Sequence, residues 1–439
     1  MIINIFLFIF EAIFALVLIK IFLFNEKYQR FFTSTFLLLF SILFIFVPLV
    51  LFCFLDNLTR VNSYLDQMYF SYESLFTAHF YTIFILSLFF LYSKIKFSTS
   101  ETELISIKHY QNYVVAFYVS AAIAIAGIFF LFYGFGTLDV RSIWVAGRFG
   151  SIANSYSSIV ISQYLISASM LTIGLFYFIN FSYMRVILLT IVIGTLLFYS
   201  LITFDRKFIF YIASGILGGY FLKHRLIYIK KRWVFYAFIG VFLLSISQII
   251  RDFLGSFLAS NDLDFNLYFS NFLNDLIFFM EYGDISYFYR ASIESVELTR
   301  NGAIEIGAVF WRNILFFIPS SLSFGIKPPD VSLIFAEAIG ASGGGRIGNQ
   351  PPGFYGLFLV SFGQILSILP ISLFLLVCAF FDRLSQKRWI NAPMAICGLF
   401  TALFLLRGDD SSAIYFLVFN YIIFLMSYII CVFFNHKSA

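Results

Sequence analysis

Residues 308–352 read AVFWRNILFFIPSSLSFGIKPPDVSLIFAEAIGASGGGRIGNQPP. Most of the chain is apolar, yet this stretch holds five of its eight prolines and a Gly-Gly-Gly run at 343–345. Because proline and glycine interrupt helices, we expect a shaped loop here. The wider segment 251–352 holds eleven of the 23 Asp and Glu residues. The sequence therefore predicts a polar loop that caps one end of an apolar helical bundle.

The composition predicts an all-α polytopic membrane protein. The chain has 439 residues, of which 61% are hydrophobic, 22% aromatic and 12% charged, and a soluble core of this size could not bury so much apolar surface. Apolar runs long enough for a transmembrane helix recur along its length. We expect about eleven such helices, at 2–24, 34–55, 75–93, 112–133, 158–181, 185–204, 208–222, 234–250, 353–381, 394–406 and 413–434.

These helices divide the chain into three regions. Helices one to eight occupy residues 1–250, a large external loop with interfacial helices occupies 251–352, and the last three helices occupy 353–439. An amphipathic interfacial helix is expected at 303–321, and Pro370 is expected to kink the helix that contains it.

The positive charge is distributed unevenly between the two predicted faces. Short loops after alternate spans hold most of the lysines, which places them and the C-terminus in the cytoplasm and the large loop outside. The net charge of +5 is too small to indicate nucleic-acid binding. The outer face carries, apart from Lys207 and Lys327, only arginines: Arg60, Arg141, Arg148, Arg206, Arg251, Arg290, Arg300, Arg312, Arg346 and Arg407.

An arginine-rich outer face indicates recognition of an anion, because the guanidinium binds phosphate through two parallel hydrogen bonds. The alternative is that these arginines pair with carboxylates of the loops. Two expected spans are also short, so the charges that flank them would lie below the membrane surface. These charges are Asp205, Arg206 and Lys207 before span 208–222, and Arg407, Asp409 and Asp410 after span 394–406. Snorkelling or local pairing is the alternative here.

Neither metal nor cofactor binding is expected. Cys53, Cys378, Cys397 and Cys431 all lie in apolar segments, which favours free thiols. The four histidines lack metal-ligand spacing.

Three blocks resemble the oligosaccharide repeat-unit polymerases, the Wzy-type membrane proteins that assemble bacterial O-antigen, common antigen and capsule chains. The first is LITFDRKFIFYIASGILGGYFLKHR at 201–225. The second runs from WRNILFFIPSSLSFGIKPP to GNQPPGFYGLFLVSFGQILSILPISLFLLV within 311–377, and the third is LFLLRGDDSSAIYFLVFNYIIFLM at 403–426. The resemblance covers about half of the chain. It implies a GT-C-like membrane glycosyltransferase of the bacterial inner membrane whose active site faces the periplasm.

The implied reaction joins two polyprenyl-pyrophosphate-linked oligosaccharides and expels polyprenyl pyrophosphate, with a chain-length regulator as a further partner. The candidates for pyrophosphate binding are Arg206, Arg251, Arg290, Arg312, Arg346, Arg407 and Lys207. The family resemblance carries over most directly to Arg206, Arg312 and Arg407. The candidates for the base are Asp410, Asp409, Glu281 and Asp205, with Glu337 behind them. Asp409 and Asp410 could instead only neutralise Arg407. Tyr355, Trp311 and Tyr282 are candidate stacking faces for sugars, or else core and interface residues.

Two other functions remain open. An O-antigen ligase would share the donor, but it typically uses a histidine of the large external loop, and residues 251–352 contain none. A flippase for lipid-linked glycans would need a charge-lined path, whereas the expected spans carry almost no charge except at their outer ends.

Overall fold

The computed structural model describes residues 2–23, 30–50, 60–62, 67–69, 71–94, 110–136, 156–203, 207–224, 284–315, 325–339, 351–387 and 389–436. The helices of the N-terminal half are α1 (Ile2–Leu23), α2 (Phe31–Ser41) with the π-helix η1 (Ile42–Phe46), α4 (Tyr72–Lys94), α5 (Tyr110–Phe135), α7 (Tyr156–Ser167), α8 (Ser169–Leu175) with the 3-10 helix η3 (Phe176–Phe178), α9 (Tyr183–Thr203) and α10 (Lys207–His224).

The C-terminal half is also helical. It contains α13 (Asp284–Leu298), α14 (Ala308–Ile314), α15 (Val331–Ala338), α16 (Phe354–Leu366), α17 (Ile368–Lys387), the 3-10 helix η5 (Trp389–Asn391), α18 (Ala392–Ile396), α19 (Gly398–Arg407) and α20 (Asp410–His436). Two short strands, β1 (Arg60–Asn62) and β2 (Gln67–Tyr69), pair antiparallel with Val61 opposite Met68.

The predicted polytopic membrane architecture is confirmed. Seven described helices are long and apolar enough to cross a membrane, and the bent pair Trp389–Ile396 and Gly398–Arg407 could make an eighth. One further expected span, 185–204, coincides with the shorter apolar helix Tyr183–Phe198, and the shorter apolar helix Phe354–Leu366 covers the first part of the span expected at 353–381. The span expected at 208–222 is α10, and the one expected at 234–250 lies outside the described residues. The total of eleven stays a prediction.

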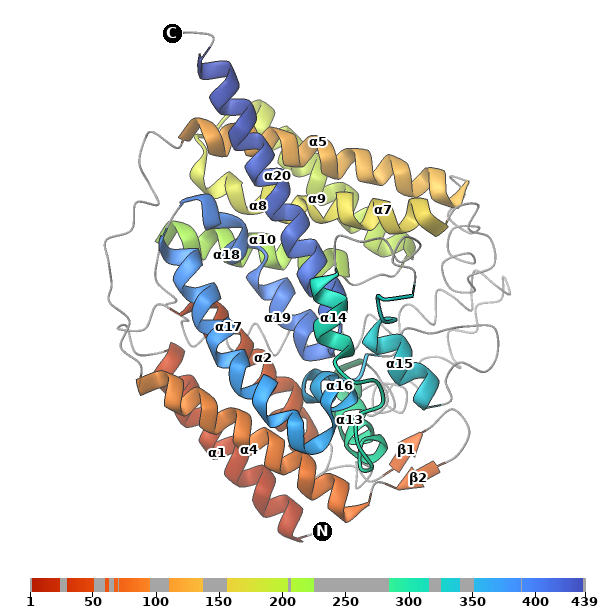
Figure 1. Cartoon of the computed structure of the whole chain (residues 1–439). Helices are drawn as coiled ribbons and strands as arrows, with labels where there is room; N and C mark the ends of the chain where they lie inside the picture. The colour runs from red at the N-terminus through yellow and green to blue at the C-terminus, as the bar shows by residue number, and fades with distance from the viewer. Residues whose placement is uncertain are drawn as a thin grey trace, which may run out of the picture.

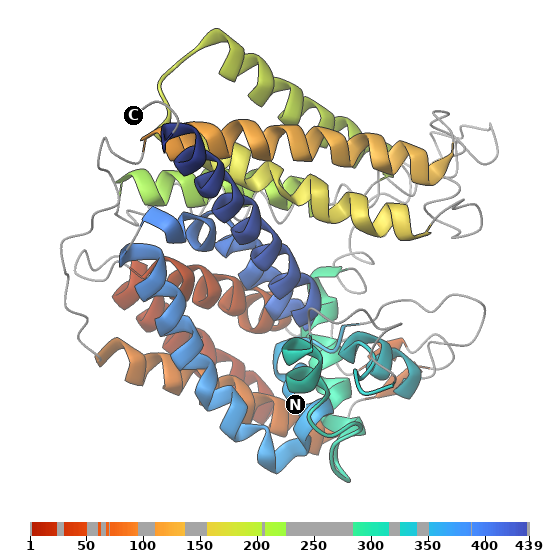
Figure 2. The same ribbon diagram turned by 45° about the horizontal axis from the view of Figure 1, so that its top comes forward.

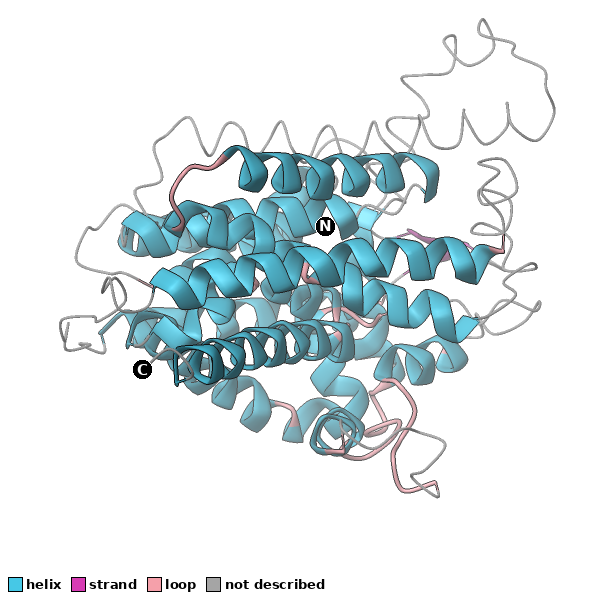
Figure 3. Ribbon diagram, turned by 90° about the horizontal axis from the view of Figure 1, so that it is seen from above, coloured by secondary structure: helices cyan, strands magenta, loops and turns pink. Residues whose placement is uncertain are grey.

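The helices lie side by side along roughly one direction, in two groups joined by the C-terminal helices (Figures 1 and 3). One hydrophobic core forms mainly among α5, α7 to α10 and α18 to α20, and the other among α1, α2, α4, α13, α16 and α17. The C-terminal helices α18 to α20 lie between α1 and α4 on one side and α5 to α10 on the other (Figure 2). The helix α13, from the segment expected to be a large loop, is part of the fold, since it packs against α16, α4 and η1.

The single span expected at 353–381 is wrong in its boundaries, because the helix breaks at Gly363. This residue has φ 71° and ψ 177°, and a Cβ atom there would lie 2.9 Å from the backbone nitrogen of Ala303. The turn beside it is held by Ile304, whose amide donates to the Val360 carbonyl at 2.9 Å. Pro370 does not cause the break, because it lies in the first turn of α17, where its missing N–H has no intrahelical partner to lose. The membrane-crossing helix is therefore Ile368–Ser385.

Two other expectations change in detail. The span expected at 394–406 is a pair of helices that begins at Trp389 and bends by 44°. The interfacial helix expected at 303–321 is confined, within the described residues, to α14, on which Phe310, Trp311 and Ile314 are more than half exposed. Of the four cysteines, the three described ones are buried, and Cys53 lies outside the described residues.

A buried carboxylate ties three helices together at the end of the bundle predicted to be cytoplasmic. Asp382 of α17 is 3% exposed and accepts hydrogen bonds from the Phe32 amide at 2.8 Å and from the Thr33 hydroxyl. The hydroxyl of Tyr92, from α4, lies 3.4 Å from the same carboxylate. Since an oxygen at the start of a helix satisfies N–H groups that lack an intrahelical partner, Asp382 caps α2 from another helix.

Candidate functional site

The candidate site forms where the turn between α19 and α20 meets the turn before α16. The amide of Gly353 donates to the carbonyl of Arg407 at 3.0 Å. Gly408 has φ 86°, and a Cβ atom there would lie 2.6 Å from the carbonyl oxygen of Gly353. Only glycine fits this backbone conformation and this close approach without strain. The contact brings two of the family-like blocks, 311–377 and 403–426, into one place.

Arg312 of α14 is the centre of the site. Its Nη1 donates to the carbonyl of Pro328 at 2.9 Å, and its Nε donates to Oγ of Ser411 at 3.1 Å. Nε also lies 3.3 Å from Oδ2 of Asp330, in an ion pair whose side chains are 15% and 12% exposed. The guanidinium therefore holds together α14, the loop before α15 and the first turn of α20.

Asp330 is bound on both of its oxygens. Its Oδ1 accepts hydrogen bonds from the amide of Ser332 at 3.1 Å and from the Ser332 hydroxyl, so it caps the N-terminus of α15. Its Oδ2 accepts a hydrogen bond from the Ser411 hydroxyl at 2.7 Å. Asp330 thus fixes the loop that carries the Pro328 carbonyl against Arg312.

Two further carboxylates lie at the start of α20. Asp409 is 6% exposed, and its Oδ1 accepts a hydrogen bond from the amide of Ser412 at 3.0 Å. Burial, followed by the charge of Asp330, raises the pKa of Asp409. Asp410 is 1% exposed, and its Oδ2 accepts a hydrogen bond from Nδ2 of Asn313. Among the described residues its other oxygen, Oδ1, has no hydrogen-bond partner.

Two of the arginines expected on the outer face form ion pairs with carboxylates. Burial and the neighbouring Arg312 lower the pKa of Lys327, whose ammonium lies 5.9 Å from the centre of the Tyr415 ring. Arg312 is paired with Asp330, and Arg300 forms an ion pair with Glu73 of α4. For Arg312 and Arg300, the structure therefore agrees with the alternative interpretation, in which the arginines pair with carboxylates of the protein. The predicted cationic cavity stays a prediction.

The other predicted residues are placed as follows. Arg206, Arg251, Arg346, Glu281, Asp205 and Tyr282 lie outside the described residues. Lys207 begins α10, with its ammonium 5.8 Å from the Phe208 ring centre, and Arg290 is a buried residue of α13. Glu337 is an exposed residue of α15.

Tyr355 cannot offer a stacking face to a sugar. It is fully buried, and its ring stacks on that of Tyr81 at 5.7 Å between centroids. It is a core residue, which was the alternative interpretation. Trp311, by contrast, is 53% exposed on α14, one residue before Arg312.

Asp330, Asn313 and Ser411 were not among the predicted site residues, although each contacts one that was. One indication for Asp330 was present in the sequence. An aspartate that follows Pro328 and Pro329 and precedes an apolar run is typical of a helix N-cap. Asn313 and Ser411 show no comparable pattern, since their roles depend on contacts between segments about a hundred residues apart.

In the described part of the chain, no group of three or more His, Cys, Asp or Glu residues has the geometry of a metal site. No family model, curated protein or solved structure matches the chain.

Proposed function

We propose that this chain is a membrane glycosyltransferase that polymerises polyprenyl-pyrophosphate-linked oligosaccharide repeat units on the periplasmic face of the bacterial inner membrane. The single observation that carries the proposal is that Arg312 contacts the first turn of α20 through Ser411, next to the buried carboxylates Asp409 and Asp410. Asp410 has one oxygen held by Asn313, while its second oxygen has no partner among the described residues. A carboxylate held in one orientation with a vacant lone pair is suited to accept a proton.

In the proposed reaction, a sugar hydroxyl of one lipid-linked unit attacks the anomeric carbon of the chain on the other lipid. A new C–O bond forms while the bond between that carbon and the pyrophosphate oxygen breaks. The bonding pair leaves with polyprenyl pyrophosphate, and the hydroxyl proton passes to Oδ1 of Asp410. The reaction needs no redox partner.

Arg312 would stabilise the negative charge that develops on the departing pyrophosphate. Fixed donors directed at developing charge are commonly the largest contribution to catalysis. In the described structure Nε of Arg312 faces Ser411 and Asp330, so substrate oxygens would compete with these two for the guanidinium. Arg407, three residues before Asp410, is the nearest predicted cation in the sequence.

The glycan chain length in a strain that lacks this gene tests the proposal. Complementation with the gene is expected to restore long chains, and the strain without it is expected to carry single repeat units on the acceptor. No transfer at all would instead identify a ligase, and loss of any external lipid-linked unit would identify a flippase. Either of these two results contradicts a polymerase.

One observation favours transport as a second candidate function. Glu11 of α1 and His79 of α4 form a hydrogen-bonded pair, with 2.8 Å between Oε1 and Nδ1, and both are at most 1% exposed. Ionisable residues inside transmembrane helices often mark ion or proton pathways. Glu11→Gln separates the two functions, because a flippase that uses this pair would lose export of the lipid-linked unit. A polymerase would keep its external intermediates.

A further inference from the structure

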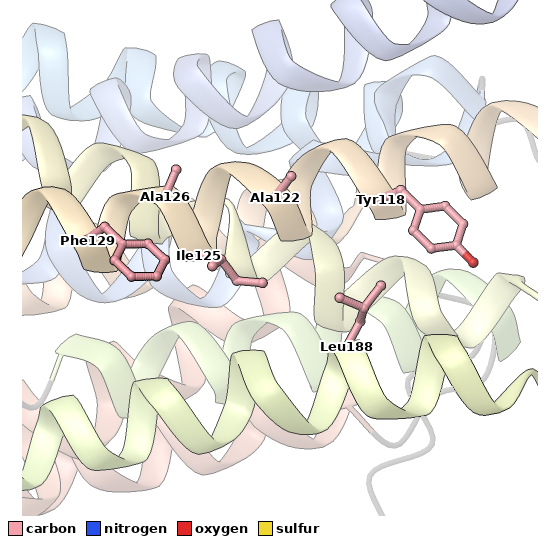
Figure 4. Close-up of a pocket in the computed structure, with 6 residues that line it drawn as sticks. All are labelled: Tyr118, Ala122, Ile125, Ala126, Phe129 and Leu188. Atoms are coloured by element: carbon pink, nitrogen blue, oxygen red, sulfur yellow. The ribbon is translucent and has the colours of Figure 1, made fainter.

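A groove of about 480 Å³ lies between α5 and α9, on the far side of the bundle from α1 and α4 (Figure 4). Its lining residues are Tyr118, Ala122, Ile125, Ala126, Phe129 and Leu188. Figure 4 shows Leu188 of α9 directed toward α5 and Ile125 of α5 directed toward α9. The Tyr118 hydroxyl is the single polar side-chain group among these six residues. The volume is within the range of small-molecule sites, about 300–1,000 Å³.

The groove follows the direction of α5 from Tyr118 to Phe129. Eleven residue steps of helix cover about 16 Å, which is roughly half the thickness of a hydrocarbon core. An apolar groove of this length in the membrane region is suited to an extended hydrocarbon chain.

Arg185 lies at the Tyr118 end of this groove. Its Nε donates to the Tyr118 hydroxyl at 3.4 Å, and its Nη1 donates to the Tyr110 hydroxyl at 3.1 Å and to the Asn180 carbonyl at 2.8 Å. In the described part of the chain, every one of these acceptors is a neutral oxygen. Arg185 is therefore held in a fixed orientation without a carboxylate to neutralise its charge.

The surroundings of Arg185 are those of a membrane–water interface. Phe181 and Tyr183, on the turn that leads into α9, are 74% and 82% exposed. Exposed aromatic residues beside a basic residue at a helix end are typical of the level of the lipid headgroups. The groove therefore begins at headgroup level and continues into the hydrocarbon region.

We propose that this groove binds one hydrocarbon chain of a lipid whose phosphate headgroup pairs with Arg185. The apolar lining accepts the chain, and the unneutralised guanidinium selects an anionic head over a zwitterionic one. The Tyr118 hydroxyl links the two parts, since it lines the groove and accepts from Arg185. This site is independent of the proposed glycosyl transfer, because α5 and α9 carry none of the residues assigned to that reaction.

Native mass spectrometry of the purified full-length protein tests the proposal. The protein is delipidated in detergent and given phosphatidylglycerol or phosphatidylcholine with identical acyl chains. We expect the wild type to retain phosphatidylglycerol at least tenfold better than phosphatidylcholine. Arg185→Ala should remove this preference, and Ala126→Phe, which fills the groove, should reduce retention of both lipids.

Lys223→Ala is the matched control, because Lys223 is an exposed basic residue of α10 that does not line the groove. It should keep the wild-type preference. Equal retention of the two lipids by the wild type would identify ordinary boundary lipid and overturn the proposal. An unchanged preference in Arg185→Ala, or an equal loss in Lys223→Ala, would overturn it as well. Thermal unfolding of each variant confirms that the comparison is made on folded protein.

Discussion

Replacement of Asp382 by alanine tests how the two ends of the chain are held together. Asp382 lies in α17, yet it accepts hydrogen bonds from the Phe32 amide and the Thr33 hydroxyl in the first turn of α2. The two segments are separated by about 350 residues in the sequence. The substitution would leave both donors buried and without this partner.

The size of the effect follows from these two donors. A buried donor that loses its partner costs about 1–3 kcal/mol, so the loss of both partners in Asp382→Ala is expected to lower the free energy of unfolding by about 2–6 kcal/mol. Asp382→Asn keeps one acceptor oxygen for the Phe32 amide, and we expect it to cost about 1–2 kcal/mol. The prediction therefore includes the order of stability, in which the wild type is the most stable, Asp382→Asn is intermediate and Asp382→Ala is the least stable.

Thermal unfolding in detergent provides the measurement. We expect the midpoint of Asp382→Ala to fall by about 5 °C or more. Ser372→Ala is the matched control on the same helix, because the Ser372 hydroxyl bonds only to the Ile368 carbonyl of its own helix at 2.7 Å. Its midpoint should stay within about 1 °C of the wild type. If Asp382→Ala unfolds with the midpoint of this control, the proposed cap contributes nothing.

Three further predictions concern the site and its support. Gly408→Ala should lower both the thermal midpoint and any activity, because it places a Cβ 2.6 Å from a backbone oxygen at φ 86°, while Gly194→Ala, with open space around it, should be neutral or stabilising by up to about 1 kcal/mol. Burial raises the pKa of Glu294 from 4.5 to about 7, so ionisation costs the folded state stability as pH rises across this range. Glu294→Gln should accordingly unfold at a higher temperature than the wild type above pH 7 and at the same temperature below pH 4.5, and equal midpoints at high pH would contradict the burial of this carboxyl. Arg312→Ala and Asp330→Asn should be non-additive in unfolding free energy by about 0.5–3 kcal/mol, as expected for residues in contact, and strict additivity would argue against their pairing.

The membrane helices could be predicted from the sequence because each is a long, continuous apolar run. The spans expected at 75–93 and 112–133 agree with α4 (Tyr72–Lys94) and α5 (Tyr110–Phe135) to within three residues at each end. The break at Gly363 could not be predicted in this way. Its cause is the close approach of the turn at Ala303, about sixty residues earlier, and the apolar pattern continues through it unchanged.

The candidate site was predictable in part. The Asp409-Asp410 pair and Arg312 stand out in the sequence as charges in an apolar chain. The structure places Asp409 and Asp410 at the start of α20 and brings Arg312 of α14 against Ser411 in the first turn of that helix. The ion pair between Arg312 and Asp330 could not be predicted, because it depends on how α14 and the loop before α15 pack against each other. The sequence left both roles of Tyr355 open for a related reason, since composition does not distinguish a buried aromatic ring from an exposed one.

Polymerisation by the purified protein tests the central claim most directly. The protein is reconstituted in lipid with polyprenyl-pyrophosphate-linked repeat units, and the lengths of the products are followed for the wild type, Asp410→Asn and the Ser372→Ala control. We expect the wild type and the control to form long chains, and Asp410→Asn to be slower by about 10²–10⁴-fold, which is the usual contribution of a general base. Long chains formed by Asp410→Asn at the wild-type rate would contradict the account.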